Sequence, residues 1–383
     1  MCKVVLVYGE TYLKYDFGPT HPLRPERYRL TVELIKALDL VKHGIIELQQ
    51  PRQATDDELS LVHNRDYIDF VKAASLTGYG YLDYGDTPAF KGVYEVSAYK
   101  VGGSLVAADL VMTGKCDHAF NIGGGLHHAA SGRAAGFCVF NDVAITAKYL
   151  LEKYKVKRLL IVDFDAHHGD GTQEVLYNEP RALKIDLHES GRYLYPGKGF
   201  VDEMGEGDAK GFMVNVPLPP DTFNDAYLKA FDEVVVPLFK NFKPEVVIQQ
   251  TGVDTHYTDI LTHMALTSKG YRSYLKAMHS LVHEVGAKYV MLGGGGYSLS
   301  AVSRVWTIAT SIVAGREIPV NLELPDGWKK LYQSITYAEL PSIIDDEKEP
   351  ELSEARKERV MREVEESIAE VKSKIFPLHG LSP

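Results

Sequence analysis

Residues 158–171 read RLLIVDFDAHHGDG and place three aspartates and two adjacent histidines directly after an apolar run. The apolar and β-branched residues of 158–162 predict a buried strand, and the glycines that follow predict a loop. The polar side chains therefore lie where a strand ends. In a parallel α/β sheet this is the edge at which ligands bind, because the carboxyl ends of strands and the amino ends of helices meet there.

Other short β-rich runs alternate with segments of helical length along the chain. Helical patterns begin at Asn141 and Ser268. The predicted strands are 3–9, 118–125, 158–165, 182–189, 245–254 and 288–297, with an additional strand at 213–219. This alternation predicts an α/β fold in which a mostly parallel sheet has helices on both faces.

The chain is predicted to form one domain, because it has no internal repeat, no low-complexity tract and no long Gly/Ser linker. We expect a catalytic unit over 1–320 and a helical extension over 321–383 that packs on or beside it. An apolar stripe at helical spacing, closed by Pro377, predicts an amphipathic helix within 352–376 that packs on the parent domain or on a partner. The stripe consists of Val360, Val364, Ile368, Val371 and Ile375.

Composition excludes several classes of protein. The 383 residues carry a formal net charge of −10, and no clustered basic surface is evident, so a nucleic-acid partner is not expected. Cys2, Cys116 and Cys138 lack the spacing of a disulfide framework or a thiolate metal site, which predicts reduced thiols. No segment is typical of a signal peptide or membrane span, so we expect a cytoplasmic protein without a membrane partner.

Four of the predicted strands end in polar or glycine-rich residues, which favours a metal site. Asp165 and His167 are two residues apart and face the same side of an extended strand. Asp254, which ends another strand, is the natural third ligand. Two carboxylates and one imidazole leave an open position for water, as in a catalytic site. The alternative is that these side chains only form ion pairs or caps at strand ends.

Two further motifs indicate acid–base and oxyanion chemistry. His127 and His128 follow a glycine run, and Asp163 and Asp170 are suited to orient them as general base and acid. Tyr297 follows four glycines, where its phenol could donate a hydrogen bond to a developing oxyanion. Ordinary packing of a loop tyrosine and a glycine-rich phosphate loop are the alternatives here.

These residues, in this order, resemble the histone deacetylase superfamily, and among its members the prokaryotic histone-deacetylase-like and acetoin-utilisation proteins. The resemblance extends from about Val4 to Arg316. It rests on the motifs HPLRPER (21–27), GGGLHHA (123–129), GFCVFND (136–142), VDFDAHHGDG (162–171), GVDTH (252–256) and LGGGGY (292–297).

The resemblance implies the arginase/deacetylase α/β fold, with an eight-stranded parallel sheet, and a zinc-dependent amide hydrolase. By matching position it implies metal ligands at Asp165, His167 and Asp254, tandem acid–base histidines at His127 and His128, their carboxylate partners at Asp163 and Asp170, and a carbonyl-polarising phenol at Tyr297. Carboxylate-rich ligation accepts Fe²⁺, Co²⁺ or Mn²⁺ as well as Zn²⁺.

The resemblance also implies residues around the substrate. These are the aromatic pair Phe137 and Tyr195 with Gly136 completing the wall, the rim residue Asp86, the substrate-binding residue Gly295, Leu261 at the entrance, and Arg27 at an acetate exit channel. A structural K⁺ or Na⁺ is implied near Asp163, Asp165, His167, Asp186 and Leu187. The chain departs from the family pattern where Tyr195 replaces phenylalanine, Asp186 replaces serine and Ile260 replaces proline.

The predicted function is removal of acetyl or other acyl groups from lysine side chains of proteins, with release of acetate. An acetylpolyamine amidohydrolase on the same scaffold is the nearest alternative; such enzymes tend to carry an acidic residue where this chain has Leu261. A dinuclear manganese ureohydrolase is disfavoured, because His256 stands where a second carboxylate is needed. A catalytically idle acyl-lysine binder is the remaining alternative. Substrate, acyl length and oligomeric state stay open.

Overall fold

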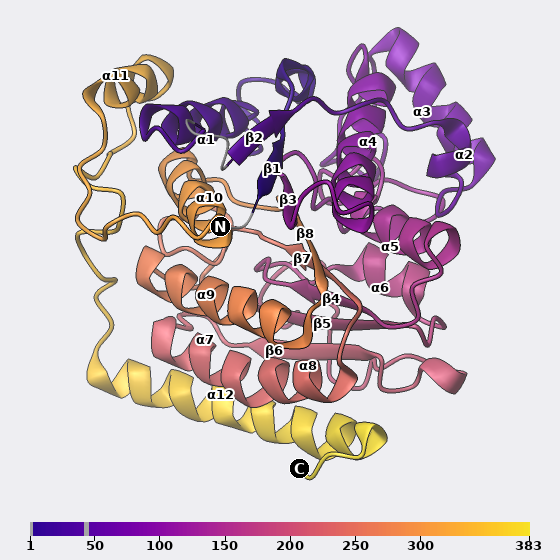
Figure 1. Ribbon diagram of the computed structural model, residues 1–383, viewed down its shortest axis with the longest axis vertical. Coiled ribbons are helices and arrows are strands. Elements are labelled where there is room, and N and C mark those ends of the chain that lie inside the picture. Colours follow the sequence, from indigo (N-terminus) through magenta and orange to yellow (C-terminus); the bar gives the residue numbers. More distant parts are fainter. Residues whose placement is uncertain (1–2, 42–45) are drawn as a thin grey trace.

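The computed structural model describes residues 3–41 and 46–383, which form a single α/β domain around an eight-stranded sheet (Figure 1). Every strand pair in the sheet is parallel, and the strand order is β2-β1-β3-β8-β7-β4-β5-β6. The strands are β1 (Val4–Val7), β2 (Ile46–Gln49), β3 (His118–Asn121), β4 (Leu159–Asp163), β5 (Ala182–Glu189), β6 (Met213–Leu218), β7 (Val246–Gln250) and β8 (Lys288–Leu292).

Helices connect the strands and follow the last one. They are α1 (Glu26–Ala37), α2 (Asp56–Leu59), α3 (Arg65–Thr77), α4 (Val93–Met112), α5 (Asp142–Lys153), α6 (Asp170–Leu176), α7 (Asn224–Ala230), α8 (Val236–Phe242), α9 (Ser268–Val285), α10 (Leu299–Val313), α11 (Asp326–Ile335) and α12 (Glu354–Ile375). The two helices predicted from Asn141 and Ser268 are α5 and α9. Asn141 caps α5 by accepting a hydrogen bond from the Ala144 N–H, and α9 ends at Gly286 in the left-handed conformation.

Successive side chains of the strands point to opposite faces of the sheet, and each face is covered by helices (Figure 1). In β1, Val4 and Leu6 pack in one apolar cluster with α1, α9 and α10. Val5 and Val7 pack in another cluster with α4 and α5. A strand that is apolar on both faces is what a sheet buried between two helical layers requires. The predicted arrangement of helices on both faces is confirmed.

The seven predicted strand runs contain β1, β3, β4, β5, β6, β7 and β8, and the eighth strand, β2, was not identified from its own sequence. Only Ile46 of its four residues is buried, because β2 lies at one end of the sheet. An edge strand with three exposed residues has neither the apolar run of a central strand nor a long alternation. Residues 42–45, which precede β2, lie outside the described residues.

The predicted amphipathic helix is α12, whose five stripe residues are buried. It packs against β6, α7 and Phe231–Val235 of the parent domain (Figure 1, yellow). Lys372 bonds to Glu233, and Arg356 pairs with Asp221, so polar contacts flank the apolar stripe. Of the two predicted partners for this stripe, the structure shows the parent domain.

Two further predictions concern thiols and membranes. Cys116 and Cys138 are free and buried, whereas Cys2 lies outside the described residues. Among the described residues, no helix combines the length and apolar character needed to cross a bilayer.

Candidate functional site

The sheet order brings the predicted site residues together. β3, β8, β7 and β4 are consecutive neighbours, and all four run in the same direction. The loops that follow them carry His127 and His128, Tyr297, Asp254, and Asp165 with His167 respectively. Side chains from four separate parts of the chain therefore meet at the carboxyl edge, as expected for a parallel sheet.

Asp165, His167 and Asp254, which we call the Asp-His-Asp group, form a compact buried cluster. Their ligand atoms all lie within 4.8 Å of one another. His167 Nδ1 is 3.0 Å from Asp254 Oδ2 and 3.2 Å from Asp165 Oδ1. Two converging carboxylates and one imidazole are a donor set suited to a divalent transition metal, so these residues fit the metal that the sequence predicts.

Neighbouring groups hold Asp165 in place. Its Oδ2 accepts hydrogen bonds from the Gly295 N–H at 2.7 Å and from Gln250 Nε2 at 2.6 Å. A Cβ atom at position 295 would lie 2.1 Å from Asp254 Oδ2, so only glycine fits here. The predicted site residue Gly295 is therefore required by close approach to two of the three candidate ligands.

His127 and His128 are each hydrogen-bonded to an aspartate. His127 Nδ1 donates to Asp163 Oδ2 and His128 Nδ1 donates to Asp170 Oδ1, each at 2.9 Å. The two Nε2 atoms are 3.1 Å apart. These are the carboxylate partners that the sequence predicts, and each fixes the tautomer and orientation of its imidazole.

The two histidines differ in their electrostatic surroundings. Burial lowers the pKa of His127, but the charges of Asp163 and Asp165 outweigh it and raise that pKa to about 9. Burial and the neighbouring His127 charge lower the pKa of His128 to about 4, against the opposing effect of Asp170. The surroundings therefore give His127 a higher proton affinity than His128.

The loop that presents these histidines is anchored by residues that the sequence analysis did not single out. Asn141 Nδ2 donates to the carbonyls of His127 and Ala129 at 3.1 and 3.0 Å. Asp142 accepts hydrogen bonds from the Gly125 and Leu126 N–H groups at 3.0 and 2.7 Å. Both residues end the motif GFCVFND, so the motif itself was the available signal, but its last two positions were given no role.

Tyr297, Phe137 and Tyr195 surround the approach to the Asp-His-Asp group. The Tyr297 ring lies 6.3 Å from the His167 ring and 5.9 Å from the Phe137 ring, and the Tyr195 ring lies 5.2 Å from the His128 ring. A Cβ atom on Gly136 would lie 2.4 Å from His128, so only glycine fits beside this imidazole. Burial, followed by the charge of Asp254, raises the pKa of Tyr297 well above its usual value, so the phenol keeps its proton.

The remaining predicted substrate residues lie farther out. Asp86 is exposed and accepts a hydrogen bond from Thr87 Oγ1, which in turn accepts from the Phe137 N–H. Partial desolvation of the carboxyl group and the nearby Asp83 raise the pKa of Asp86 to about 6. Leu261 is half-buried on the loop after Asp254, where its N–H donates to Asp259. These positions agree with a rim and an entrance.

Arg27 lies behind the glycine loop rather than at the entrance. It is buried, and its Nη1 donates to the carbonyls of Gly294 and Gly296 at 2.9 and 3.1 Å. Its Nε is buried without a hydrogen-bond partner among the described residues. A cationic group with an unused donor next to the candidate metal group is suited to bind a small carboxylate.

Asp186, which the sequence places near a monovalent cation, uses its side chain for hydrogen bonds within the protein. Asp186 Oδ2 accepts hydrogen bonds from the Gly169 N–H and from Lys184, and Oδ1 accepts one from His188 Nδ1. The Lys184 ammonium therefore already supplies a positive charge beside this carboxylate. The expected K⁺ or Na⁺ near Asp163, Asp165, His167, Asp186 and Leu187 stays a prediction.

His256 stands where a dinuclear ureohydrolase would need a second carboxylate, and its ring nitrogens contact residues outside the Asp-His-Asp group. His256 is buried, and its Nε2 lies 2.9 Å from Asp346 Oδ2, while its Nδ1 lies 2.9 Å from Thr258 Oγ1. Asp346 also accepts a hydrogen bond from Arg304 at 2.9 Å. His256 therefore belongs to a buried network with Asp346 and Arg304 and is not one of the candidate metal ligands.

Comparisons with known proteins agree with this geometry. The family model described as histone deacetylase domain matches residues 21–313. The chain belongs to the histone deacetylase family. Acetoin utilization protein AcuC of Bacillus subtilis (strain 168) is 41% identical over 331 residues, which cover 82% of this chain and 84% of that protein. AcuC of Staphylococcus xylosus is 40% identical over 365 residues, covering 92% and 93% respectively.

Solved structures of this family share the fold. The crystal structure of a histone deacetylase homologue from Aquifex aeolicus superposes with a TM-score of 0.82 at 32% identity and covers 96% of this chain and all of that one. A histone deacetylase homologue in complex with SAHA gives a TM-score of 0.83 at the same identity and coverage. The predicted arginase/deacetylase fold is confirmed, and the chain is an AcuC-like hydrolase of the histone deacetylase family.

Proposed function

We propose that this protein is a zinc-dependent deacylase that hydrolyses the amide bond of acetylated lysine side chains. The observation that carries the proposal is the pair of His–Asp dyads, His127–Asp163 and His128–Asp170, directly beside the buried Asp-His-Asp group. A binding module that only held acyl-lysine has no need of two buried imidazoles with different proton affinities. This arrangement is suited to general acid–base catalysis of amide hydrolysis.

Asp165, His167 and Asp254 would hold the metal ion. When bound, a divalent ion there supplies Lewis-acid polarisation of the acyl carbonyl and lowers the pKa of water. His128, neutral and oriented by Asp170, takes the proton of the attacking water at Nε2. His127, protonated and paired with Asp163, stabilises negative charge as it develops, and the protonated histidine pair then delivers a proton to the leaving amine.

Tyr297 donates a hydrogen bond from its phenol to the carbonyl oxygen as that oxygen becomes negative. The loop that carries Tyr297 is anchored by a hydrogen bond, which the Tyr297 N–H donates to Asp259 Oδ2 at 2.7 Å. Asp259 also accepts the Leu261 N–H at 2.9 Å. One carboxylate thus ties the backbone of Tyr297 to the entrance loop.

Phe137 and Tyr195 form the walls along which the methylene chain of a lysine would lie. Tyr195 is 43% exposed and Phe137 is half-buried, so the passage leads from the surface to the buried metal group. On the far side, the unpaired Nε of Arg27 is suited to bind the released acetate. The pocket therefore has distinct places for the chain, the acyl carbonyl and the carboxylate product.

A groove beside the entrance bears on the choice of substrate. It has a volume of about 750 Å³ and is lined by residues from four segments, including His21, Ile260, Tyr297 and Glu347. A groove of this size accommodates residues on both sides of a modified lysine. Its lining also includes the acidic Glu339, Glu349 and Glu351, and this favours cationic substrates, so an acetylpolyamine is the second candidate.

The test is hydrolysis by the purified, zinc-loaded protein of an acetyl-lysine peptide, N-acetylputrescine and N-acetylspermidine at matched concentrations. We expect a higher kcat/KM on the peptide, and no activity in Asp254→Ala. The matched variant Leu261→Glu adds an acidic side chain at the entrance, and its activity should shift toward the acetylated amines.

If the unaltered protein prefers the acetylated amines, the proposed lysine deacylation is wrong, and polyamine deacylation takes its place as the function. Absence of activity on acetyl, propionyl and longer acyl amides alike, in protein that contains metal at the Asp-His-Asp group, would contradict hydrolysis and favour an acyl-lysine binder. Activity that persists in Asp254→Ala would contradict the proposed metal ligation.

A further inference from the structure

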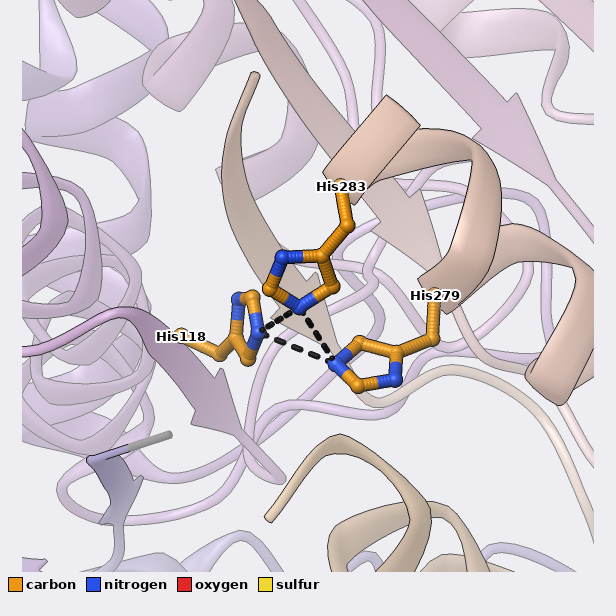
Figure 2. Close-up of side chains that lie close together, drawn as sticks. All are labelled: His118, His279 and His283. Carbon is orange, nitrogen blue, oxygen red and sulfur yellow. Dashed lines mark hydrogen bonds between the residues drawn. The ribbon is translucent and has the colours of Figure 1, made fainter. Parts of the chain in front are cut away.

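A second group of potential metal ligands lies at the opposite edge of the sheet. It consists of His118, His279 and His283, which we call the histidine trio (Figure 2). Their three Nε2 atoms converge, with separations of 3.2 Å between His118 and His283, 3.1 Å between His118 and His279, and 2.9 Å between His279 and His283. None of these residues takes part in the site described above.

The topology explains why these three residues meet. His118 is the first residue of β3, and it pairs with Tyr289 near the start of β8. His279 and His283 are four residues apart on α9, so they lie on the same face of that helix. Only Gly286 and Ala287 separate α9 from β8, which places the last turn of the helix beside the amino ends of β8 and β3 (Figure 1).

Hydrogen bonds among the imidazoles cannot account for this geometry. Each Nε2 either carries a proton or presents a lone pair. For three mutually close atoms, every assignment of protons leaves at least one pair in which two lone pairs or two N–H groups face each other. Pairwise angles of 79–80° between the ring planes also exclude stacking. The triangle therefore has at least one repulsive contact unless a cation lies among the nitrogens.

We propose that the histidine trio binds a zinc-class transition-metal ion, separate from the catalytic centre, and that this ion fastens α9 to the amino edge of the sheet. Ligand nitrogens about 2.0–2.1 Å from a tetrahedral ion are about 3.3 Å apart, close to the observed separations. Imidazole suits Zn²⁺, Ni²⁺ and Cu²⁺, whereas Mg²⁺ and Ca²⁺ prefer oxygen.

The surroundings of the histidine trio agree with such a site. His118 is buried at 3% exposure, and its Nδ1 has no hydrogen-bond partner among the described residues, so its Nε2 is the ring atom that contacts the other two histidines. His283 is exposed, so the histidine trio reaches the surface of the protein, where a metal ion can enter.

The experiment measures zinc bound per chain after metal-free protein is saturated and desalted, together with kcat on the best substrate. We expect two equivalents in the unaltered protein and one in His283→Asn, with kcat unchanged. The control His379→Asn removes a half-buried histidine far from both groups in sequence and should keep both equivalents. Cobalt titration should give visible d–d absorption from two sites in the unaltered protein and from one site in His283→Asn.

The outcomes separate this proposal from the proposed function. Equal zinc content and equal zinc affinity with and without His283 would overturn the second site, since loss of a ligand should weaken binding at least about 10-fold. One equivalent in the unaltered protein that disappears in His283→Asn would support the histidine trio and contradict the catalytic metal. Because His283 is exposed, His283→Asn should fold; His118→Asn provides an independent second variant.

Discussion

The two edges of the same sheet gather metal-binding side chains in different ways. At the carboxyl edge, the Asp-His-Asp group is fully buried and surrounded by donors that hold its carboxylates, such as Gln250 and the Gly295 N–H. At the amino edge, the histidine trio consists of imidazoles alone, and its members range from the buried His118 to the exposed His283. Acid–base residues accompany only the first group.

This difference shows that a parallel sheet can keep its catalytic residues at one edge and the residues that attach a helix to the sheet at the other. Loops that follow strands can converge on a substrate, so the carboxyl edge collects histidines, carboxylates and a phenol around one space. The amino edge receives helices as they return to the sheet, so residues there can tie a helix end to a strand. We therefore expect changes at the carboxyl edge to alter turnover and changes at the amino edge to alter stability.

The largest effect is expected from Asp254→Ala. Loss of one carboxylate ligand should lower kcat at least about 10³-fold, because metal polarisation contributes several kcal/mol to the barrier. Zinc analysis should show that one equivalent remains, held by the histidine trio. Loss of both equivalents, with the fold intact by circular dichroism, would show that the two edges are not independent.

Tyr297→Phe should lower kcat about 10²- to 10³-fold, because the variant lacks one donor to the developing oxyanion. Zinc content and melting temperature should match those of the unaltered protein, since the phenol is not a ligand. Steady-state kinetics and zinc analysis on the same preparation check both points. Near-full activity of this variant would contradict the proposed role of the phenol and leave the metal as the only group that stabilises the oxyanion.

Asp346→Asn should destabilise the fold behind the carboxyl edge. The Asp346 carboxylate accepts hydrogen bonds from Arg304, the Ser268 N–H and His256, and breaking a buried ion pair of this kind costs about 3–5 kcal/mol. Denaturant unfolding measures the difference. Asp326→Asn is the control, because Asp326 pairs with Lys329 at the surface, and the change should cost less than about 0.5 kcal/mol.

The same aspartate predicts a pH dependence. Burial raises the pKa of Asp346, but the hydrogen bond from His256 and the charge of Arg304 outweigh it and hold that pKa well below its usual value. Since the folded-state pKa is depressed, the contribution to stability is full at neutral pH and declines as the pH falls below about 4. The difference in unfolding free energy between the unaltered protein and the Asp346→Asn variant should therefore narrow only in acid. A constant difference from about pH 7 to about pH 3 would contradict this ion pair.

The smallest effect is expected at the amino edge. Zinc at about 100 times its dissociation constant stabilises a folded site by about 2.7 kcal/mol, which raises the melting temperature by a few degrees. In the Asp254→Ala background this rise reports the histidine trio alone. It should be lost when His283→Asn is added and kept when His379→Asn is added.

The sequence predicted much of the carboxyl edge because its residues are grouped in short motifs. Asp165 and His167 are two positions apart, His127 and His128 are adjacent, and each group follows a recognisable strand. Alternation of strands and helices then places those groups at one edge without further information. The eight-stranded parallel sheet follows from the same pattern, apart from the exposed edge strand β2.

The amino edge could not be predicted in the same way. His118 and His279 are 161 residues apart, and no motif contains both. Only the pairing of β3 with β8, and the short connection from α9 to β8, bring them together. Lys184 was likewise overlooked, because its contact with Asp186 places an ammonium group inside a strand that otherwise reads as apolar.

The helix α12 lies along β6, which is the last strand at one end of the sheet (Figure 1). A terminal strand has unpaired backbone donors and acceptors along one side, and these can recruit a strand from another molecule. With its buried stripe in place, α12 shields this end of the sheet against such recruitment. Removal of α12 would therefore promote strand-to-strand aggregation of the protein even where the catalytic residues remain correctly folded.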